Sequence, residues 1–266
     1  MGACRIVYFG DIMGATGRRY LQAQLPAIKQ HYQPDFIFAN AENATNGFGL
    51  TKATAEELHA MGIQGLSLGN HTWDQKSFWG EINSIPYVCR PANLPPTCPG
   101  LTYLVFNWNG ESIAIINLLG RACINMSLDC PFRTAQHLVE SLKTQGVHNI
   151  LIDFHAETTS EKCAMGWFGS TLRVCAVMGT HTHIQTADER ILNDQTAFIC
   201  DLGMCGASNS ILGAKKDPII DKFINGKPCR YEAADGPAKI NGALICIDCT
   251  THKALSIERI TLMEAC

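Results

Sequence analysis

The sequence predicts an α/β protein built as a four-layer αββα sandwich of two mixed sheets. Two observations predict this fold. Short, continuously apolar runs alternate with helix-like stretches, which is typical of parallel strands that helices cover on both faces. A predicted hairpin and a strand-rich C-terminal region indicate a second, partly antiparallel sheet. A sandwich with two central sheets accommodates both observations.

Each predicted element follows from its residue pattern. The predicted strands cover residues 5–10, 35–40, 64–69, 101–108, 111–120, 148–154, 173–179, 230–234, 240–249 and 253–262. The predicted helices cover residues 18–31 and 52–61, a segment that opens at Pro131, and 158–168. Thr51 suits a helix N-cap, Pro131 suits a first helical turn, and Asn109-Gly110 suits a type I′ hairpin turn. Because no linker-like segment interrupts the chain, we expect one domain over residues 1–266.

Composition restricts the class of protein. The 266 residues are 46% hydrophobic and 17% charged, an ordinary balance for a protein with a sizeable core. The net charge is -3 and no dense Lys/Arg run occurs, so we expect no stable complex with nucleic acid. No apolar run approaches the ~20 residues of a membrane span, so we expect no membrane association.

The thirteen cysteines indicate a reducing compartment. Their number is odd and most lie inside apolar runs, as buried free thiols do. Cys246 and Cys249 form a C-x-x-C pattern within a predicted strand, where alternation points the two sulfurs to opposite faces. This argues against a metal or redox site there, and the cytoplasm is the expected location.

Polar residues of metal-ligand type follow five of the predicted strands. In chain order they are Asp11, Glu42 with Asn43, Asn70 with His71, His155, and His181 with His183. Ligands of open α/β sheets bind outside the carboxyl ends of strands, so neighbouring strands would bring these side chains to one crevice. The mixture of carboxylate, amide and imidazole suits manganese, iron or zinc better than calcium or magnesium.

Each of these residues has an ordinary alternative role. Asp11 fits a turn or a helix cap, Glu42 and Asn43 fit a solvated loop, and His155 fits a buried, hydrogen-bonded histidine. The run from Gly179 to His183 is the sharpest signal, since two histidines one residue apart in an extended loop reach different sides of a metal pair. The order in which all of them occur favours the metal interpretation.

That order resembles the calcineurin-like metallophosphoesterases, and the longer motifs resemble the YmdB-like branch over nearly the whole chain. The motifs are GDIMGATGR, NAENATNGFGL, GNHTWD, RPANLP, IDFHAETTSEK and VMGTHTHIQTAD. The superfamily's first motif is Asp-x-His and its bridging carboxylate is Asp, whereas Met13 and Glu42 occupy those places here. Both departures are typical of the YmdB-like branch, whose members are bacterial 2′,3′-cyclic nucleotide phosphodiesterases.

The resemblance implies a metallophosphoesterase-like fold and two metal ions per chain, with iron as the first expectation and manganese or zinc as alternatives. One ion would be bound by Asp11, Glu42, Asn43 and His183, and the other by Glu42, Asn70, His155 and His181. Glu42 would bridge them. Two such ions share a bridging hydroxide and clamp phosphoryl oxygens during in-line displacement. His71, next to Asn70, is the candidate general acid; its alternative is a hydrogen bond to a ligand.

We therefore expect a binuclear phosphodiesterase that acts on small cyclic nucleotides. A phosphomonoesterase or protein phosphatase is one alternative, because the same metals serve it. A regulatory metal-binding protein with slow turnover is another. Phe48 and Trp73 lie near the ligand loops and fit either base stacking or the core. Apolar residues in the C-terminal strands favour a homo-oligomer.

Overall fold

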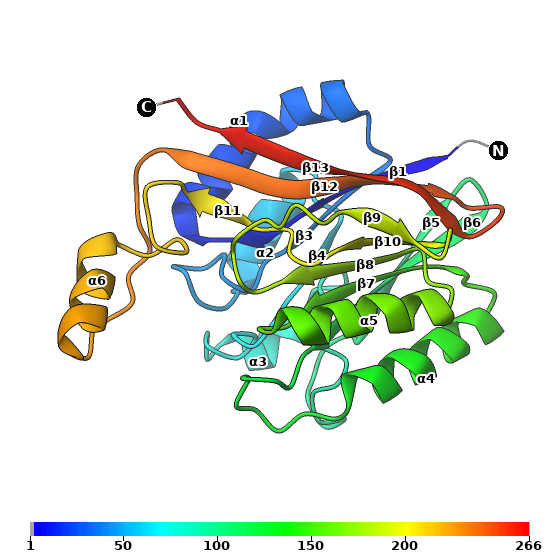
Figure 1. Ribbon diagram of the computed structural model, residues 1–266, viewed down its shortest axis with the longest axis horizontal. Coiled ribbons are helices and arrows are strands. Elements are labelled where there is room, and N and C mark those ends of the chain that lie inside the picture. Colours follow the sequence, from blue (N-terminus) through cyan, green and yellow to red (C-terminus); the bar gives the residue numbers. More distant parts are fainter. Residues whose placement is uncertain (1–2, 266) are drawn as a thin grey trace.

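The computed structural model describes residues 3–265 and shows two stacked sheets between two layers of helices (Figure 1). The first sheet contains β1 (Cys4–Phe9), β2 (Asp11–Ile12), β3 (Phe36–Asn40), β4 (Gly65–Ser67), β11 (Met204–Ala207), β12 (Ala238–Asp248) and β13 (Lys253–Met263). The second contains β5 (Tyr103–Trp108), β6 (Glu111–Leu119), β7 (Asn149–His155), β8 (Ala176–Thr180), β9 (Arg190–Leu192) and β10 (Thr196–Ile199). The predicted αββα sandwich of two mixed sheets is confirmed.

The helices are α1 (Gly14–Tyr32), α2 (Lys52–Ala60), α3 (Phe78–Glu81), α4 (Pro131–Thr144), α5 (Thr159–Thr171) and α6 (Lys216–Asn225), with a 3₁₀ turn, η1 (Ile82–Ser84). One apolar cluster joins α1, α2 and α3 to the first sheet, and another joins α4 and α5 to the second. A third cluster fills the space between the sheets. No helix within residues 3–265 has the length and hydropathy needed to cross a bilayer.

Strand alternation explains how the residues of one apolar strand pack against two different layers of the fold. In β1, Val7 and Phe9 face the outer helices, while Ile6 and Tyr8 face the second sheet. A strand buried on both faces needs apolar residues at every position, which is why these runs read as continuous.

The parallel strands are divided between the two sheets. β1, β3 and β4 run parallel in the first, and β6, β7, β8 and β10 run parallel in the second. The hairpin β5–β6 belongs to the second sheet, whereas the C-terminal β12–β13 pair belongs to the first. The hairpin and the C-terminal strands, which the sequence analysis grouped in one sheet, therefore lie in different sheets, and each sheet combines a parallel centre with antiparallel strands.

Local signals predicted the turns and caps correctly. The Thr51 side chain accepts a hydrogen bond from the Thr54 N–H, and Pro131 opens α4. Asn109 and Gly110 both have positive φ, as a type I′ turn requires. All twelve cysteines among the described residues are free thiols, and Cys266 lies outside that range.

Two element predictions need correction. The first helix begins at Gly14, not near residue 18. Gly17 lies in its first turn against the Cys205 carbonyl, where a side chain would not fit, so this glycine serves packing and not a loop. The expected strand 230–234 is irregular and makes a single bridge, between Ala233 and Ala214. That segment belongs to an excursion between β11 and β12 (residues 208–237), which we call the arm.

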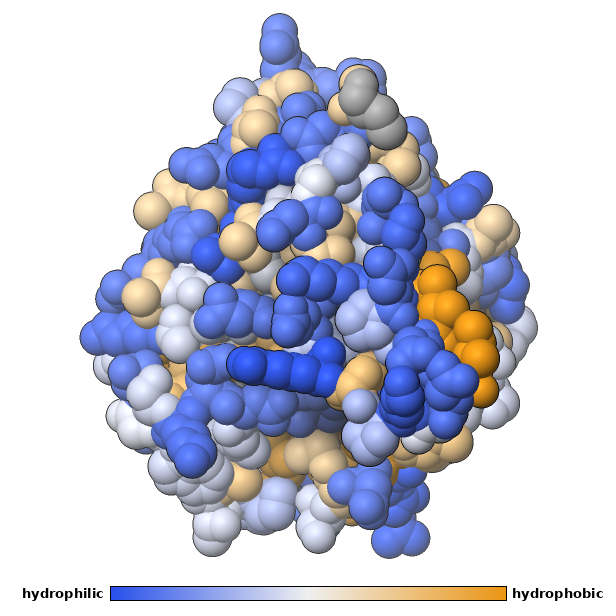
Figure 2. Space-filling view, turned by 90° about the vertical axis from the view of Figure 1, so that its left-hand side faces the viewer, coloured by the Kyte–Doolittle hydropathy of each residue, from blue (hydrophilic) through white to orange (hydrophobic). Residues whose placement is uncertain are grey.

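The arm projects from the body and carries α6 at its tip (Figure 1). Ile220, Phe223 and Ile224 of this helix are exposed, Phe223 by 81%. Figure 2 shows the corresponding side of the molecule, which is mostly hydrophilic apart from one narrow, strongly hydrophobic band. The single-domain and homo-oligomer expectations stay predictions.

Candidate metal centre

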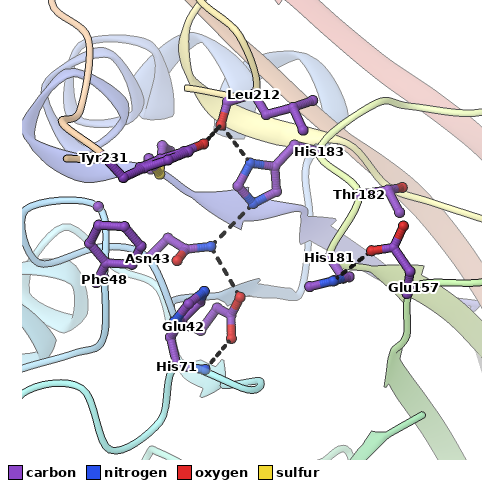
Figure 3. A pocket seen from close by; sticks show the side chains of 12 residues that line it. Glu42, Asn43, Phe48, His71, Glu157, His181, Thr182, His183, Leu212 and Tyr231 are labelled. Carbon is purple, nitrogen blue, oxygen red and sulfur yellow. Dashed lines mark hydrogen bonds and ion pairs between the residues drawn. The ribbon is translucent and has the colours of Figure 1, made fainter. Parts of the chain in front are cut away.

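Loops that follow strands of both sheets meet at one end of the sandwich. Asp11 lies in β2, and Glu42 and Asn43 follow β3; Asn70 and His71 follow β4. From the facing sheet, His155 ends β7, and His181 and His183 follow β8. The structure thus brings together all eight side chains predicted from the sequence. Five of them line a pocket of about 360 Å³ (Figure 3): Glu42, Asn43, His71, His181 and His183.

The first group of donor atoms surrounds the His155 imidazole. Its Nε2 lies 3.0 Å from Glu42 Oε1, 3.1 Å from Asn70 Oδ1 and 3.0 Å from His181 Nδ1. Two of these neighbours are oxygens that only accept hydrogen bonds. Adjacent ligands of one ion with bonds of about 2.1 Å lie ~3 Å apart, so the spacing fits a shared cation.

The second group shares Glu42 Oε1 with the first. The Asn43 amide nitrogen lies 3.1 Å from this oxygen and 3.1 Å from His183 Nε2. Asp11 Oδ1 lies 3.9 Å from the same His183 nitrogen. For Asn43 to bind an ion, a half-turn of its amide must bring the oxygen to the place of the nitrogen.

Each of the three imidazoles uses its other nitrogen for a hydrogen bond outside these groups. His155 Nδ1 lies 2.9 Å from Thr180 Oγ1, whose hydroxyl donates to the buried Asp153 carboxylate at 2.7 Å. His181 Nε2 pairs with Glu157 at 2.9 Å, and His183 Nδ1 with the Leu212 carbonyl at 2.9 Å. Such partners fix the tautomer and direct the remaining nitrogen to a metal.

The Asp11 carboxylate is the clearest evidence that a cation fits here. Its side chain is fully buried, and Oδ2 accepts the His181 N–H at 3.0 Å. Oδ1 has no hydrogen-bond partner among the described residues and lies 3.7 Å from His155 Nδ1. A buried anionic oxygen without a donor is costly, and a metal ion would compensate it.

The electrostatics of the cluster also favour positive charge. Burial disfavours the charged imidazole of His155, but the Glu42, Asp11 and Asp153 carboxylates outweigh it and raise its pKa to about 9. Burial opposes the ionisation of Glu42, yet His155 holds the pKa of this carboxyl well below its usual range. Burial raises the pKa of Asp11 to about 6 against the attraction of His183 and His155. Burial and the neighbouring His155 lower the pKa of His181 to about 3.

The loop that holds His181 and His183 has a strained backbone and is hydrogen-bonded to a buried ion pair. Both residues have positive φ, 99° and 63°, which is uncommon outside glycine. Beneath them, Lys162 Nζ lies 2.6 Å from Asp201 Oδ2 in a buried ion pair. The same carboxylate oxygen accepts the Thr182 N–H at 3.1 Å and its hydroxyl at 2.6 Å.

Sequence reasoning missed Lys162 and Asp201. A signal was present, because Lys162, Met165, Gly166 and Gly169 form one buried stripe on α5 at helical spacing. A lysine on such a stripe needs a buried partner.

His71 lines the pocket and contacts the cluster through its backbone. Its N–H donates to Glu42 Oε2 at 3.0 Å, and its Nδ1 lies 2.7 Å from Asp74 Oδ2. Nε2 is therefore the nitrogen available to a substrate. Phe48 also lines the pocket, whereas the partly buried Trp73 packs on the buried Phe78 and the exposed Trp79.

The two-sheet architecture defines the class: this is the fold of the metallophosphoesterases. The structure of an NAD nucleotidase from Haemophilus influenzae shares it with a TM-score of 0.63 at 13% identity, covering 98% of this chain and 56% of that one. The chain belongs to the YmdB-like family, whose model matches residues 7–260.

Two relatives are similar to this chain over nearly its whole length. A 2′,3′-cyclic-nucleotide 2′-phosphodiesterase of Bacillus subtilis (strain 168) is 42% identical over 260 residues, which is 98% of this chain and 97% of the relative. The crystal structure of a novel phosphatase from Mycoplasma pneumoniae has a TM-score of 0.93 at 34% identity, covering 99% of this chain and 95% of that one.

Proposed function

We propose that this protein is a metal-dependent phosphodiesterase that hydrolyses 2′,3′-cyclic nucleotides with two metal ions. The convergence of ligand-type side chains from the ends of both sheets carries the proposal, together with the buried, unpartnered oxygen of Asp11. The similarity to the Bacillus subtilis phosphodiesterase supports the choice of substrate.

The two donor groups correspond to two ligand sets. Asp11, Glu42, Asn43 and His183 would bind one ion, and Glu42, Asn70, His155 and His181 the other. Glu42 Oε1 belongs to both groups, which supports a bridging role, while Oε2 is held by the His71 N–H. When bound, two divalent ions supply an activated water as nucleophile and neutralise charge on the phosphoryl oxygens.

His71 would protonate the leaving alkoxide. Its Nδ1 is paired with Asp74, which orients Nε2 as the proton donor. A His71→Asn variant should lower kcat on 2′,3′-cyclic AMP by about 100-fold or more. The loss on bis(p-nitrophenyl) phosphate should be much smaller, because p-nitrophenolate leaves without a proton. Equal losses on both substrates would instead assign His71 a structural role.

The metal proposal is tested by elemental analysis of protein purified without a chelating tag. We expect about two iron, manganese or zinc ions per chain, and fewer in His183→Ala. His31→Ala is the matched control, because His31 lies exposed on α1. Less than half an ion per folded chain after reconstitution would refute the ligand assignment.

A phosphomonoesterase is the second candidate, because the Mycoplasma pneumoniae relative is described as a phosphatase. Rates on bis(p-nitrophenyl) phosphate and p-nitrophenyl phosphate separate the two activities. Near-normal biological activity in a Glu42→Gln variant would instead favour a regulatory metal-binding protein.

A further inference from the structure

The pocket has two chemically different sides. One side presents the donor cluster together with Glu157 and Thr182. The other side consists of Met13, Phe48, Leu212 and Tyr231, which we call the apolar wall. In Figure 3, Phe48 and Tyr231 lie on one side of the cluster, and His181 and Glu157 lie on the other. A ligand that fills this pocket therefore has a charged end and a flat or apolar end.

The apolar wall adjoins the metal cluster directly. The Leu212 carbonyl accepts hydrogen bonds from His183 Nδ1 at 2.9 Å and from the Tyr231 hydroxyl at 3.3 Å. The Phe48 ring lies edge-on to Tyr231 at a centroid distance of 5.2 Å, and edge-on to His71 at 5.1 Å. A phosphate at the donor cluster would place its attached ring against these aromatic side chains.

The wall offers contact area but little hydrogen bonding. Three of its four side chains lack a strong donor or acceptor, and the hydroxyl of Tyr231 is already engaged by Leu212. Aromatic surfaces of this kind hold nucleic-acid bases by stacking, and stacking tolerates any base because every base has a π-face. The volume of about 360 Å³ lies at the small end of ligand pockets, which suits a mononucleotide.

We propose that the apolar wall is a nucleobase subsite that binds purines and pyrimidines by stacking without reading their edges. This inference rests on the proposed function, since it assigns the non-phosphate part of that substrate. It also gives a role to Met13, which replaces the histidine of the superfamily motif and lies against Gly47 and Gly213, the neighbours of Phe48 and Leu212.

Half of the subsite is contributed by the arm. Leu212 and Tyr231 lie near its two ends, which are joined by the Lys215–Glu232 ion pair at 2.7 Å and the Ala214–Ala233 bridge. Met13 and Phe48 come from the body of the protein. The arm thus positions two base-contacting residues beside metal ligands that the sheets supply.

The test compares a substrate with a base and one without. The probes are 2′,3′-cyclic AMP and glycerol 1,2-cyclic phosphate, and the measured quantity is the ratio of their kcat/KM values. Tyr231→Ala should lower this ratio about 5- to 150-fold, mainly through KM for the nucleotide. Tyr231→Phe should restore most of the ratio. Phe223→Ala is the control, since Phe223 is an exposed aromatic residue on the same arm.

The two proposals fail in distinguishable ways. If the metal-loaded wild-type protein hydrolyses neither probe, the proposed function is wrong. If it hydrolyses both and Tyr231→Ala leaves the ratio unchanged, only the base subsite is refuted. The 2′,3′-cyclic phosphates of all four common nucleosides should have kcat/KM values within about 10-fold of one another, and a larger preference for one base would show that its edge is read. Product binding gives a reading independent of turnover: adenosine 3′-monophosphate should bind Tyr231→Ala more weakly by calorimetry.

Discussion

Replacing Lys162 by methionine should destabilise the fold more than any change at an exposed lysine. The ion pair with Asp201 has an N–O distance of 2.6 Å, and the two side chains are 2% and 1% exposed. Removing one partner of such a pair leaves a buried charge and costs about 3–5 kcal/mol. Asp201 keeps three donors, the Thr182 N–H and hydroxyl and the Gly203 N–H, which places the expected loss near the lower limit.

The expected loss of about 3 kcal/mol corresponds to a fall in Tm of roughly 6 °C or more for a chain of this size. Urea unfolding followed by circular dichroism measures it directly. Lys76→Met, at an exposed position, is the control and should change the free energy of unfolding by less than about 0.5 kcal/mol.

A second variant tests whether the loss of stability comes from the unpaired charge of Asp201. In Lys162→Met with Asp201→Asn, the buried group is neutral and needs no counter-charge, so the double variant should be more stable than Lys162→Met alone. The reasoning is refuted if Lys162→Met costs less than about 1 kcal/mol, or if the double variant is the less stable of the two.

Three further predictions concern pH, backbone packing and metal binding. Because the pKa of His155 is raised to about 9, the stability that its charged form contributes is complete below pH ~6.5 and is lost as the pH rises through 9. The free energy of unfolding of metal-stripped protein should therefore fall by about 3 kcal/mol over that range, and a flat profile would contradict the pairing with Glu42. Gly179→Ala should cost about 1–3 kcal/mol, since its Cβ would meet the Cys200 carbonyl and Lys162, whereas Gly80→Ala has open space and should be tolerated; equal stabilities would contradict this. Metal at 100 times its Kd should stabilise the wild type by about 2.7 kcal/mol for each bound ion, an increment that a chelator removes and that Glu42→Ala should lack.

The sequence was most informative where the determinants are local. The Asn109-Gly110 turn, the Thr51 cap and the polar residues at strand ends depend on neighbours in the chain, and the structure has them as predicted. The membership of strands in sheets depends on distant partners. Cys4 of β1 pairs with Ile247 of β12, which no local pattern specifies, and the C-terminal strands were therefore grouped with the hairpin although they belong to the first sheet.

The same distinction applies to the candidate site. Side chains of ligand type were recognisable from chemistry and order, but the hydrogen bonds that connect them to their supporting residues were not. The hydroxyl of Thr180 between His155 and Asp153, and the pair beneath Thr182, become visible only when β7, β8 and α5 are assembled. The strand expected over residues 230–234 failed because its partner segment lies on the arm and forms only one bridge.

Because the donor groups come from both sheets, the metal site is complete only late in the synthesis of the chain. Asp11 Oδ2 accepts a hydrogen bond from the backbone of His181, 170 residues further along the chain. A nascent chain that has emerged only as far as α4 holds four of the seven proposed ligands and none of the histidine ligands. Under the proposed ligand sets, neither ion has all of its ligands until both β7 and β8 have been synthesised.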